Sequence, residues 1–243
     1  MEIMGIGGGD IRVGQTLPLD RLILELTGSP RPRVLFLPTA SNDDPGYVEA
    51  FTCVYGQALG ADTDALLLTQ GPGRQEISER IAWAEAIYVG GGNTRALVRR
   101  WREAGVDEML RKAGLDGTIL SGLSAGLNCW FRFCNSDAPQ LEGVPGVLTE
   151  RVEGLGFVGL TVCPHYDGEA FRPSEFRRMM AATPGPGLAL DDCCAIHVRD
   201  GSFRIVAARD AAVAHLVWSV GGEVLEETIE PFSDFRPLSW LSR

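Results

Sequence analysis

A serine flanked by glycines is the residue of this chain that is best suited to chemistry. Ser124 lies in the stretch GLSAG at 122–126, directly after the short apolar run 118–121. Gly-x-Ser-x-Gly between a strand and a helix is typical of a nucleophile elbow, a tight turn that exposes the serine hydroxyl above a sheet edge. We expect the apolar residues 127–133 to be helical. The pattern predicts a serine that attacks acyl groups, although such a turn can also serve only to join two elements.

A run of three glycines offers the hydrogen-bond donors that acyl transfer requires. Negative charge develops on the former carbonyl oxygen, and N–H groups that point at this oxygen stabilise it. The segment GGGNT at 90–94 follows an apolar run that predicts a strand. We expect one donor from the backbone of Ala125 and another from Gly91 or Gly92. The alternative is a flexible turn whose asparagine or threonine caps the next helix.

Histidine is the most common general base for a serine nucleophile, and this chain has only three. His197 and His215 lie within alternating segments that are typical of strands, where packing or surface roles are expected. His165 follows the apolar run 160–163. It is therefore predicted at the same sheet edge as the elbow, where it acts as the base.

The base needs a carboxylate that holds its tautomer and stabilises the imidazolium. Asp191 and Asp192 follow the apolar run 188–190, and Asp137 lies beyond the serine. Spacing does not choose among these three residues. One of the first two could serve only to cap a turn.

Apolar runs that alternate with amphipathic segments predict the elements that position these residues. The segments 19–26 and 97–104 have the 3.6-residue spacing of helices. The expected buried strands are 3–6, 34–37, 65–68, 87–89 and 118–120. This alternation predicts an α/β fold of one domain, residues 1–243, with a three-layer, doubly wound, mostly parallel sheet. Ligands bind such sheets at the carboxyl ends of the strands, where the loops converge.

The pattern changes after about residue 185, where β-like segments follow one another. They are 188–190, 195–198, 203–206 and 214–218, with turns such as Asp200-Gly201. We expect antiparallel strands that finish one end of the sheet.

Composition narrows the possible partners and compartment. The net charge is −10, from 32 acidic and 22 basic residues, and no long basic run is present. Nucleic acid and anionic membranes are therefore not expected as partners. The chain shows no signal peptide and no apolar stretch long enough to span a membrane, so we expect a cytoplasmic protein with reduced thiols.

Six cysteines raise the question of a metal site. A zinc site built from Cys163, His165 and the Cys193-Cys194 pair would match no usual ligand spacing. We therefore expect no metal and no other cofactor.

Four segments in order resemble the peptidase E family of serine dipeptidases. They are GGGNT at 90–94, GLSAG at 122–126, PHYD at 164–167 and LALDD at 188–192. The resemblance covers most of the chain. It implies a flavodoxin-like fold similar to class I glutamine amidotransferases, with serine in place of their cysteine. The resemblance also implies an N-terminal exopeptidase that cleaves short peptides, often after an initial aspartate, and that uses no metal. It further implies a dimer or larger homo-oligomer.

The family's functional residues can be carried over by position. Ser124 matches the nucleophile, His165 matches the base, and Gly91, Gly92 and Ala125 match the oxyanion loop.

The acid and the substrate-binding residues match less fully. The family commonly has a glutamate where this chain has Asp192, which we favour over Asp137 and Asp191. Arg172 resembles the family arginine that binds a substrate carboxylate in a bidentate way; alternatively it is a solvated charge at the start of a helix. Asn93 is the second candidate for substrate binding.

Three other functions remain to be compared with a dipeptidase. A cyanophycinase-like hydrolase would act on β-linked aspartyl-arginine units. This chain, however, has Asn93 at the position where those enzymes usually have the glutamine of a GGGQ-like or GGNQ-like segment. A catalytically silent binding protein would keep the fold without the activity. A glutaminase is disfavoured because Cys129 and Cys134 lie beyond the elbow.

Overall fold

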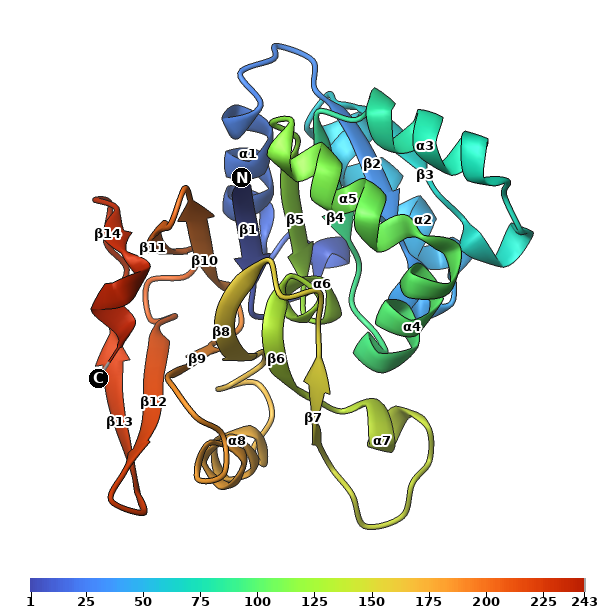
Figure 1. Cartoon of the computed structure of the whole chain (residues 1–243). Coiled ribbons are helices and arrows are strands. Elements are labelled where there is room, and N and C mark those ends of the chain that lie inside the picture. The colour runs from blue at the N-terminus through green and yellow to red at the C-terminus, as the bar shows by residue number, and fades with distance from the viewer. Residues whose placement is uncertain (243) are drawn as a thin grey trace.

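The computed structural model describes residues 1–242, which form two mixed β-sheets with helices around them (Figure 1). The first sheet has the strand order β14-β11-β10-β1-β5-β4-β2-β3. Its strands are β1 (Glu2–Ile6), β2 (Arg33–Leu37), β3 (Asp62–Ala65), β4 (Ala86–Val89), β5 (Ile119–Leu123), β10 (Cys194–Arg199), β11 (Ser202–Ala207) and β14 (Arg236–Pro237). The second sheet has the order β13-β12-β9-β8-β6-β7. Its strands are β6 (Phe131–Ser136), β7 (Glu150–Glu153), β8 (Val158–Cys163), β9 (Gly187–Leu190), β12 (Ala214–Val220) and β13 (Glu223–Ile229).

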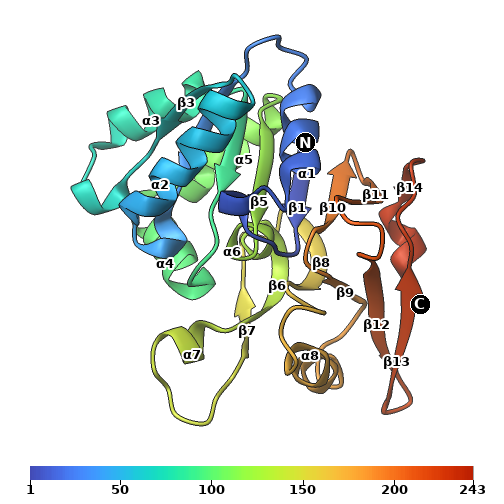
Figure 2. The ribbon, with the colours of Figure 1, turned by 180° about the vertical axis from the view of Figure 1, so that it is seen from behind.

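The central parallel strands of the first sheet, β1, β2, β4 and β5, are buried on both faces. Along β2, Val34 and Phe36 belong to one apolar cluster, whereas Leu35 and Leu37 belong to another, because successive side chains point to opposite faces. The helices are α1 (Leu17–Leu26) and α2 (Pro45–Phe51) on one face, and α3 (Arg74–Trp83), α4 (Thr94–Ala104) and α5 (Val106–Leu115) on the other. Figure 1 shows α3 and α5 in front of the sheet, and Figure 2 shows α1 and α2 in front of it from behind. The predicted three-layer, doubly wound arrangement is confirmed.

The second sheet corrects the expectation of one sheet with an antiparallel end. Only β10, β11 and β14 extend the first sheet, whereas β9, β12 and β13 belong to the second. On one face of the second sheet lies α8 (Arg172–Met180), which packs through Phe176 and Met180. On the other face, Leu188 and Leu216 join an apolar cluster that also contains Leu35 of the first sheet. The expectation of a single domain stays a prediction.

Two elements differ locally from the sequence pattern. Strand β3 lies at Asp62–Ala65 rather than 65–68, because the chain turns after Leu66, whose N–H still donates to the Phe36 carbonyl. The helix expected at 127–133 is only the single turn α6 (Ala125–Asn128), and β6 begins at Phe131. Aromatic residues favour strands, and here they pair with β7 and β8. A further short helix, α7 (Ala138–Leu141), follows β6.

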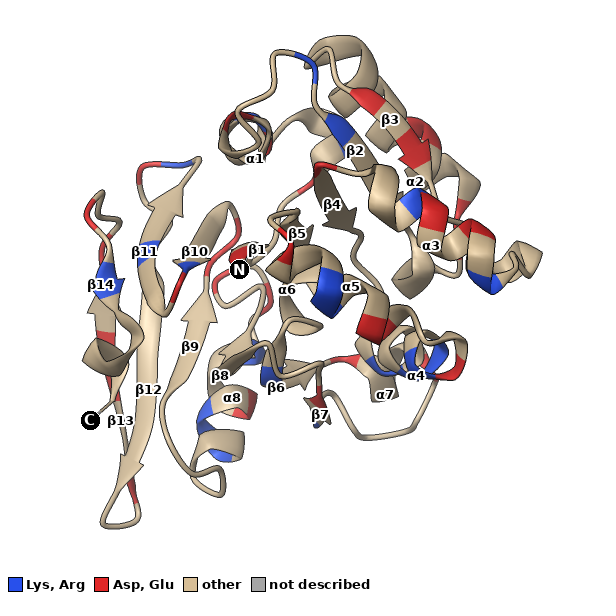
Figure 3. Cartoon of the chain, turned by 45° about the horizontal axis from the view of Figure 1, so that its top comes forward, with Lys and Arg blue, Asp and Glu red and all other residues tan. Residues whose placement is uncertain are grey.

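Charged residues of both signs are interspersed over the helices. Figure 3 shows blue and red segments side by side on α3, α4 and α8. Across residues 1–242, every helix is too short or too polar to cross a membrane.

Candidate active site

Ser124 occupies the turn between β5 and α6 in a strained conformation. Its φ and ψ are 57° and −106°, a backbone region that a residue with a side chain rarely adopts and that costs roughly 1–3 kcal/mol. The Ser124 N–H donates to the Ile6 carbonyl of β1 at 3.0 Å. The turn is therefore anchored to the neighbouring strand.

The two glycines of the elbow are required by the closeness of β4. A methyl group on Gly126 would lie 2.1 Å from the Val89 carbonyl oxygen, and one on Gly122 would lie 2.6 Å from the same atom. Backbone atoms cannot yield as a flexible side chain does. Larger residues at either position would push the turn, and with it Ser124, away from the sheet.

His165 lies directly beyond β8 and connects Ser124 to Asp192. Its Nε2 is 2.9 Å from Ser124 Oγ, and its Nδ1 is 2.7 Å from Asp192 Oδ1. The backbone holds this position, because the His165 N–H donates to the Gly7 carbonyl at 3.1 Å. The structure thus brings together three predicted residues from the ends of three strands, β5, β8 and β9.

The order of these contacts fixes the direction of proton movement. A carboxylate only accepts hydrogen bonds, so Nδ1 carries the proton that is donated to Asp192. Nε2 is then free to accept the Ser124 hydroxyl proton. The arrangement can activate a serine oxygen as a nucleophile.

Asp167, the last residue of the PHYD segment, holds the loop of the acid. Its Oδ1 accepts a hydrogen bond from the Asp192 N–H at 2.8 Å, and Arg209 forms an ion pair with its other oxygen. Burial raises the pKa of Asp167, but these two bonds outweigh burial and hold its pKa below the usual range. The carboxylate therefore stays ionised. Its role was missed because the sequence does not show which backbone it meets.

Gly8 leaves the space that the histidine and the acid occupy. A methyl group on Gly8 would lie 1.8 Å from Asp192 Oδ1 and 2.3 Å from His165 Nδ1. Sequence reasoning overlooked this residue, although the run of glycines at 7–9 follows the first strand just as GGGNT follows the fourth.

The oxyanion-loop candidates lie beside Ser124. A methyl group on Gly91 would be 3.5 Å from Ser124 Cβ, so the loop after β4 is in contact with the elbow. The Gly91 N–H donates to the hydroxyl of Tyr47 at 3.2 Å. Within residues 1–242, the N–H groups of Gly92 and Ala125 have no acceptor.

The two alternative acids are bound elsewhere. Asp191 is 4% exposed; its carboxylate accepts from the Val213 N–H at 3.1 Å and lies 3.3 Å from His215. Asp137 Oδ2 lies 3.5 Å from Arg172. In the part of the chain that the structure describes, His165 therefore meets Asp192 and neither of these two carboxylates.

Arg172 is buried rather than solvated, so the alternative of an exposed charge is wrong. Its side chain is 1% exposed and forms ion pairs with Glu169 and Asp137. Its Nη1 also donates to the backbone and side-chain oxygens of Asn135 at 3.0 and 3.2 Å. A role in substrate binding stays a prediction.

Asn93 caps α4, as the alternative reading of its segment anticipated. Its Oδ1 accepts from the Ala96 N–H, and its Nδ2 donates to Glu142, both at 2.9 Å. Its predicted role in substrate binding is likewise untested.

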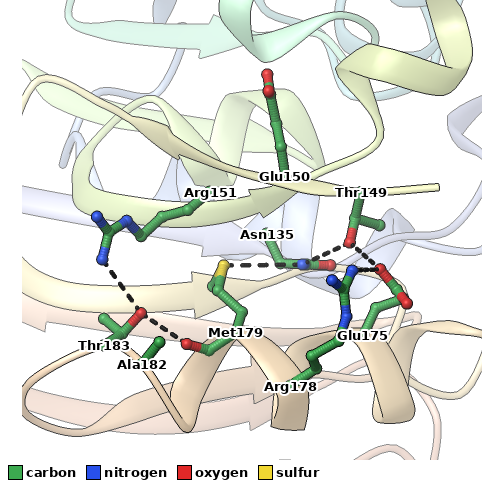
Figure 4. A pocket seen from close by; sticks show the side chains of 9 residues that line it. All are labelled: Asn135, Thr149, Glu150, Arg151, Glu175, Arg178, Met179, Ala182 and Thr183. Carbon is green, nitrogen blue, oxygen red and sulfur yellow. Dashed lines mark hydrogen bonds and ion pairs between the residues drawn. The ribbon is translucent and has the colours of Figure 1, made fainter. Parts of the chain in front are cut away.

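A separate pocket of about 320 Å³ lies between β7 and α8 (Figure 4). It is lined by Asn135, Thr149, Glu150, Arg151, Glu175, Arg178, Met179, Ala182 and Thr183. Thr149 joins Asn135 to Glu175 by hydrogen bonds, so the polar groups of the pocket largely satisfy one another. Because Asn135 also binds Arg172, this pocket borders the buried ion pairs rather than Ser124.

The described residues 1–242 contain no group of three or more His, Cys, Asp or Glu side chains that is arranged to hold a metal ion. All six cysteines are free thiols.

Comparisons with known proteins identify relatives by sequence and by structure. The sequence model of peptidase family S51 matches residues 3–206. The uncharacterized peptidase YgaJ of Bacillus subtilis (strain 168) is 36% identical over 228 residues, which cover 93% of this chain and 95% of that protein. Peptidase E of Nostoc sp. (strain PCC 7120 / SAG 25.82 / UTEX 2576) is 30% identical over 148 residues, which cover 59% of this chain and 56% of that protein.

A solved structure supports the fold over nearly the whole chain. The crystal structure of a peptidase from an acI-B1 Actinobacterium superposes with a TM-score of 0.73, at 16% identity, over 98% of this chain and 96% of that one. At this identity the similarity concerns the fold alone.

Proposed function

This chain belongs to peptidase family S51, as its resemblance to peptidase E predicted, and from that premise we propose that it is a serine exopeptidase of short peptides. The observation that carries the proposal is the continuous hydrogen-bond chain from Ser124 through His165 to Asp192. A serine with no base beside it would be a poor nucleophile near neutral pH.

In the acylation step, Ser124 Oγ attacks the carbonyl carbon of the scissile peptide bond. The new C–O bond forms as the hydroxyl proton moves to His165 Nε2 and the carbonyl π electrons move to oxygen. Asp192 stabilises the resulting imidazolium, and the N–H groups of Gly92 and Ala125 are available to the oxyanion. When the tetrahedral intermediate collapses, the C–N bond breaks and the departing amine takes the proton from Nε2.

The acyl-enzyme is then hydrolysed by the same groups in reverse roles. His165 Nε2 removes a proton from water, whose oxygen attacks the acyl carbon. Collapse of this second intermediate breaks the bond to Ser124 Oγ, which recovers its proton from the imidazolium. The enzyme returns to its initial state without a cofactor.

The substrate range that we propose is short peptides with a free N-terminus. A preference for N-terminal aspartate comes only from the peptidase E resemblance. The buried contacts of Arg172 with two carboxylates favour a structural role for that guanidinium, so we expect the preference to be weak. We retain the expectation of a homo-oligomer as part of this proposal.

Product analysis by mass spectrometry tests the activity. Purified protein is incubated with Asp-Leu, Ala-Leu, Leu-Leu and β-Asp-Arg, and the released amino acids are quantified for the wild type, Ser124→Ala and His165→Ala. We expect turnover of at least one α-linked dipeptide, with kcat reduced by about 10⁴ or more in both variants. The melting temperature should change little, because both substitutions only truncate side chains.

Other outcomes would identify the competing functions. Turnover of β-Asp-Arg alone would favour a cyanophycinase-like hydrolase. No turnover of any peptide by the folded wild type would favour a silent binding protein. Activity that persists in Ser124→Ala would reject the serine mechanism.

A further inference from the structure

Tyr47, in the first turn of α2, packs against the loop that follows β4. Asp44 caps this helix by accepting a hydrogen bond from the Tyr47 N–H at 2.7 Å. The Tyr47 ring packs edge-on against Phe36, with centroids 5.1 Å apart. The ring is also so close to Gly90 that a methyl group there would lie 2.8 Å from Tyr47 Cε1. The ring cannot move away without disturbing these contacts.

The Tyr47 hydroxyl occupies one of the N–H donors that sequence reasoning assigned to the oxyanion. Gly91 donates to this hydroxyl at 3.2 Å, and the Gly91 loop itself touches the elbow beside Ser124. In this arrangement the Gly91 N–H is engaged by the phenol oxygen. This donor can therefore act on a substrate only through the phenol.

The phenol has its own proton to give. Among residues 1–242, no acceptor for the Tyr47 O–H is present. The side chain also lines a hollow of about 470 Å³ that extends to Gly9, the neighbour of the glycine that abuts His165. Burial raises the pKa of Tyr47. The phenol is thus protonated at neutral pH, and its O–H has no acceptor among residues 1–242, although its oxygen accepts the Gly91 N–H.

We propose that Tyr47 is a catalytic residue that completes the oxyanion hole, accepting a hydrogen bond from Gly91 and donating its own to the substrate oxygen. The inference rests on the serine mechanism proposed above. A hydroxyl that accepts one hydrogen bond becomes a stronger donor of the next, so the Gly91 dipole is transmitted to the oxyanion. The proton remains on Tyr47 throughout, and no bond is broken at this residue.

Tyr47→Phe removes the hydroxyl and keeps the ring, so its contacts with Phe36 and Gly90 are retained. Tyr88→Phe is the matched control: Tyr88 is a fully buried tyrosine of the same aromatic cluster whose hydroxyl has no partner within residues 1–242. We measure kcat, KM and melting temperature with the dipeptide that the wild type cleaves fastest, and include Ser124→Ala.

In Tyr47→Phe we expect kcat to fall by about 10²-fold, as for the loss of one oxyanion donor, with KM within about threefold of the wild type. Tyr88→Phe should keep kcat within about twofold. Both variants should melt close to the wild type. A loss of this kind points to an interaction made in the transition state, whereas a purely structural role would lower the melting temperature and raise KM as well.

Provided that Ser124→Ala is inactive, two results would overturn the proposed role of Tyr47 and leave the serine mechanism in place. One is a kcat of Tyr47→Phe that matches Tyr88→Phe. The other is an increased kcat, which would mean that the hydroxyl blocks the Gly91 donor. An inactive wild type, or an active Ser124→Ala, would instead reject the serine mechanism and this inference with it.

Discussion

Ser124 and Asp192 meet only through the two nitrogens of one imidazole ring, so the protonation of the site depends on the orientation of His165. Asp192 Oδ1 accepts a hydrogen bond from the Nδ1–H group, with the two heavy atoms 2.7 Å apart, and thereby keeps Nε2 free for the serine. A different hydrogen-bond partner at Nδ1 would permit the other tautomer. The acid therefore acts on the chemistry through geometry as well as charge.

Exchanging the carboxylates for amides separates a chemical role from a structural one. Asp192→Asn should lower kcat by about 10³–10⁴, because the amide can donate to Nδ1 and so favour the wrong tautomer. Asp137→Asn should keep kcat within about threefold and lower stability by about 1–3 kcal/mol, because it removes a charge beside the buried Arg172. Steady-state kinetics and urea unfolding of both variants give these values. If Asp137→Asn lost more kcat than Asp192→Asn, Asp137 rather than Asp192 would be the acid of the site.

Residue types and spacing were sufficient to predict that Ser124 and His165 lie together. They were insufficient to choose among the acids, because Asp191 and Asp192 are adjacent and point to different partners, His215 and His165. Tyr47 was missed for a related reason. Its contact with Gly91 joins α2 to the loop after β4, and no local pattern shows this.

At the scale of elements, the site is built where strands end. Ser124 follows β5, His165 follows β8, Asp192 follows β9, and the loop at 7–9 follows β1. The sequence allowed these strands to be predicted because each is a short apolar run. The error at 127–133 arose because apolar residues alone do not distinguish a strand from a helix. There, pairing of β6 with its neighbours decides the structure.

The loop after β1 must remain free of side chains, which a glycine replacement tests. Gly8→Ala places a methyl group 1.8 Å from Asp192 Oδ1, so the acid and the imidazole must shift. We expect kcat to fall by about 10² or more, since misplacement by about 1 Å costs this much. Gly159→Ala is the control, because the corresponding methyl group in β8 meets nothing within 4 Å. Equal activity of the two variants, measured with one dipeptide, would show that Gly8 is not required for the geometry.

At the scale of the whole molecule, a buried carboxylate links folding stability to pH. Asp20 of α1 is 0% exposed within the cluster that packs α1 and α2 on the first sheet. It accepts hydrogen bonds from Thr16 at 2.8 Å and from Tyr55 at 2.9 Å. Burial outweighs these two bonds and raises the pKa of Asp20 from 3.8 to about 6.

The raised pKa gives the pH dependence of unfolding a definite sign. Between about pH 4 and 6 the folded chain keeps a proton on Asp20 that the unfolded chain has lost. Raising the pH through this range therefore favours unfolding, by about 3 kcal/mol in total. Asp20→Asn cannot titrate and should lack this contribution. Urea unfolding of the wild type and Asp20→Asn from pH 4 to 7 isolates the contribution of Asp20, because the contributions of the other titratable groups cancel when the two free energies of unfolding are subtracted. The stability of the wild type relative to Asp20→Asn should fall as the pH rises, and a difference that stays constant would contradict the raised pKa.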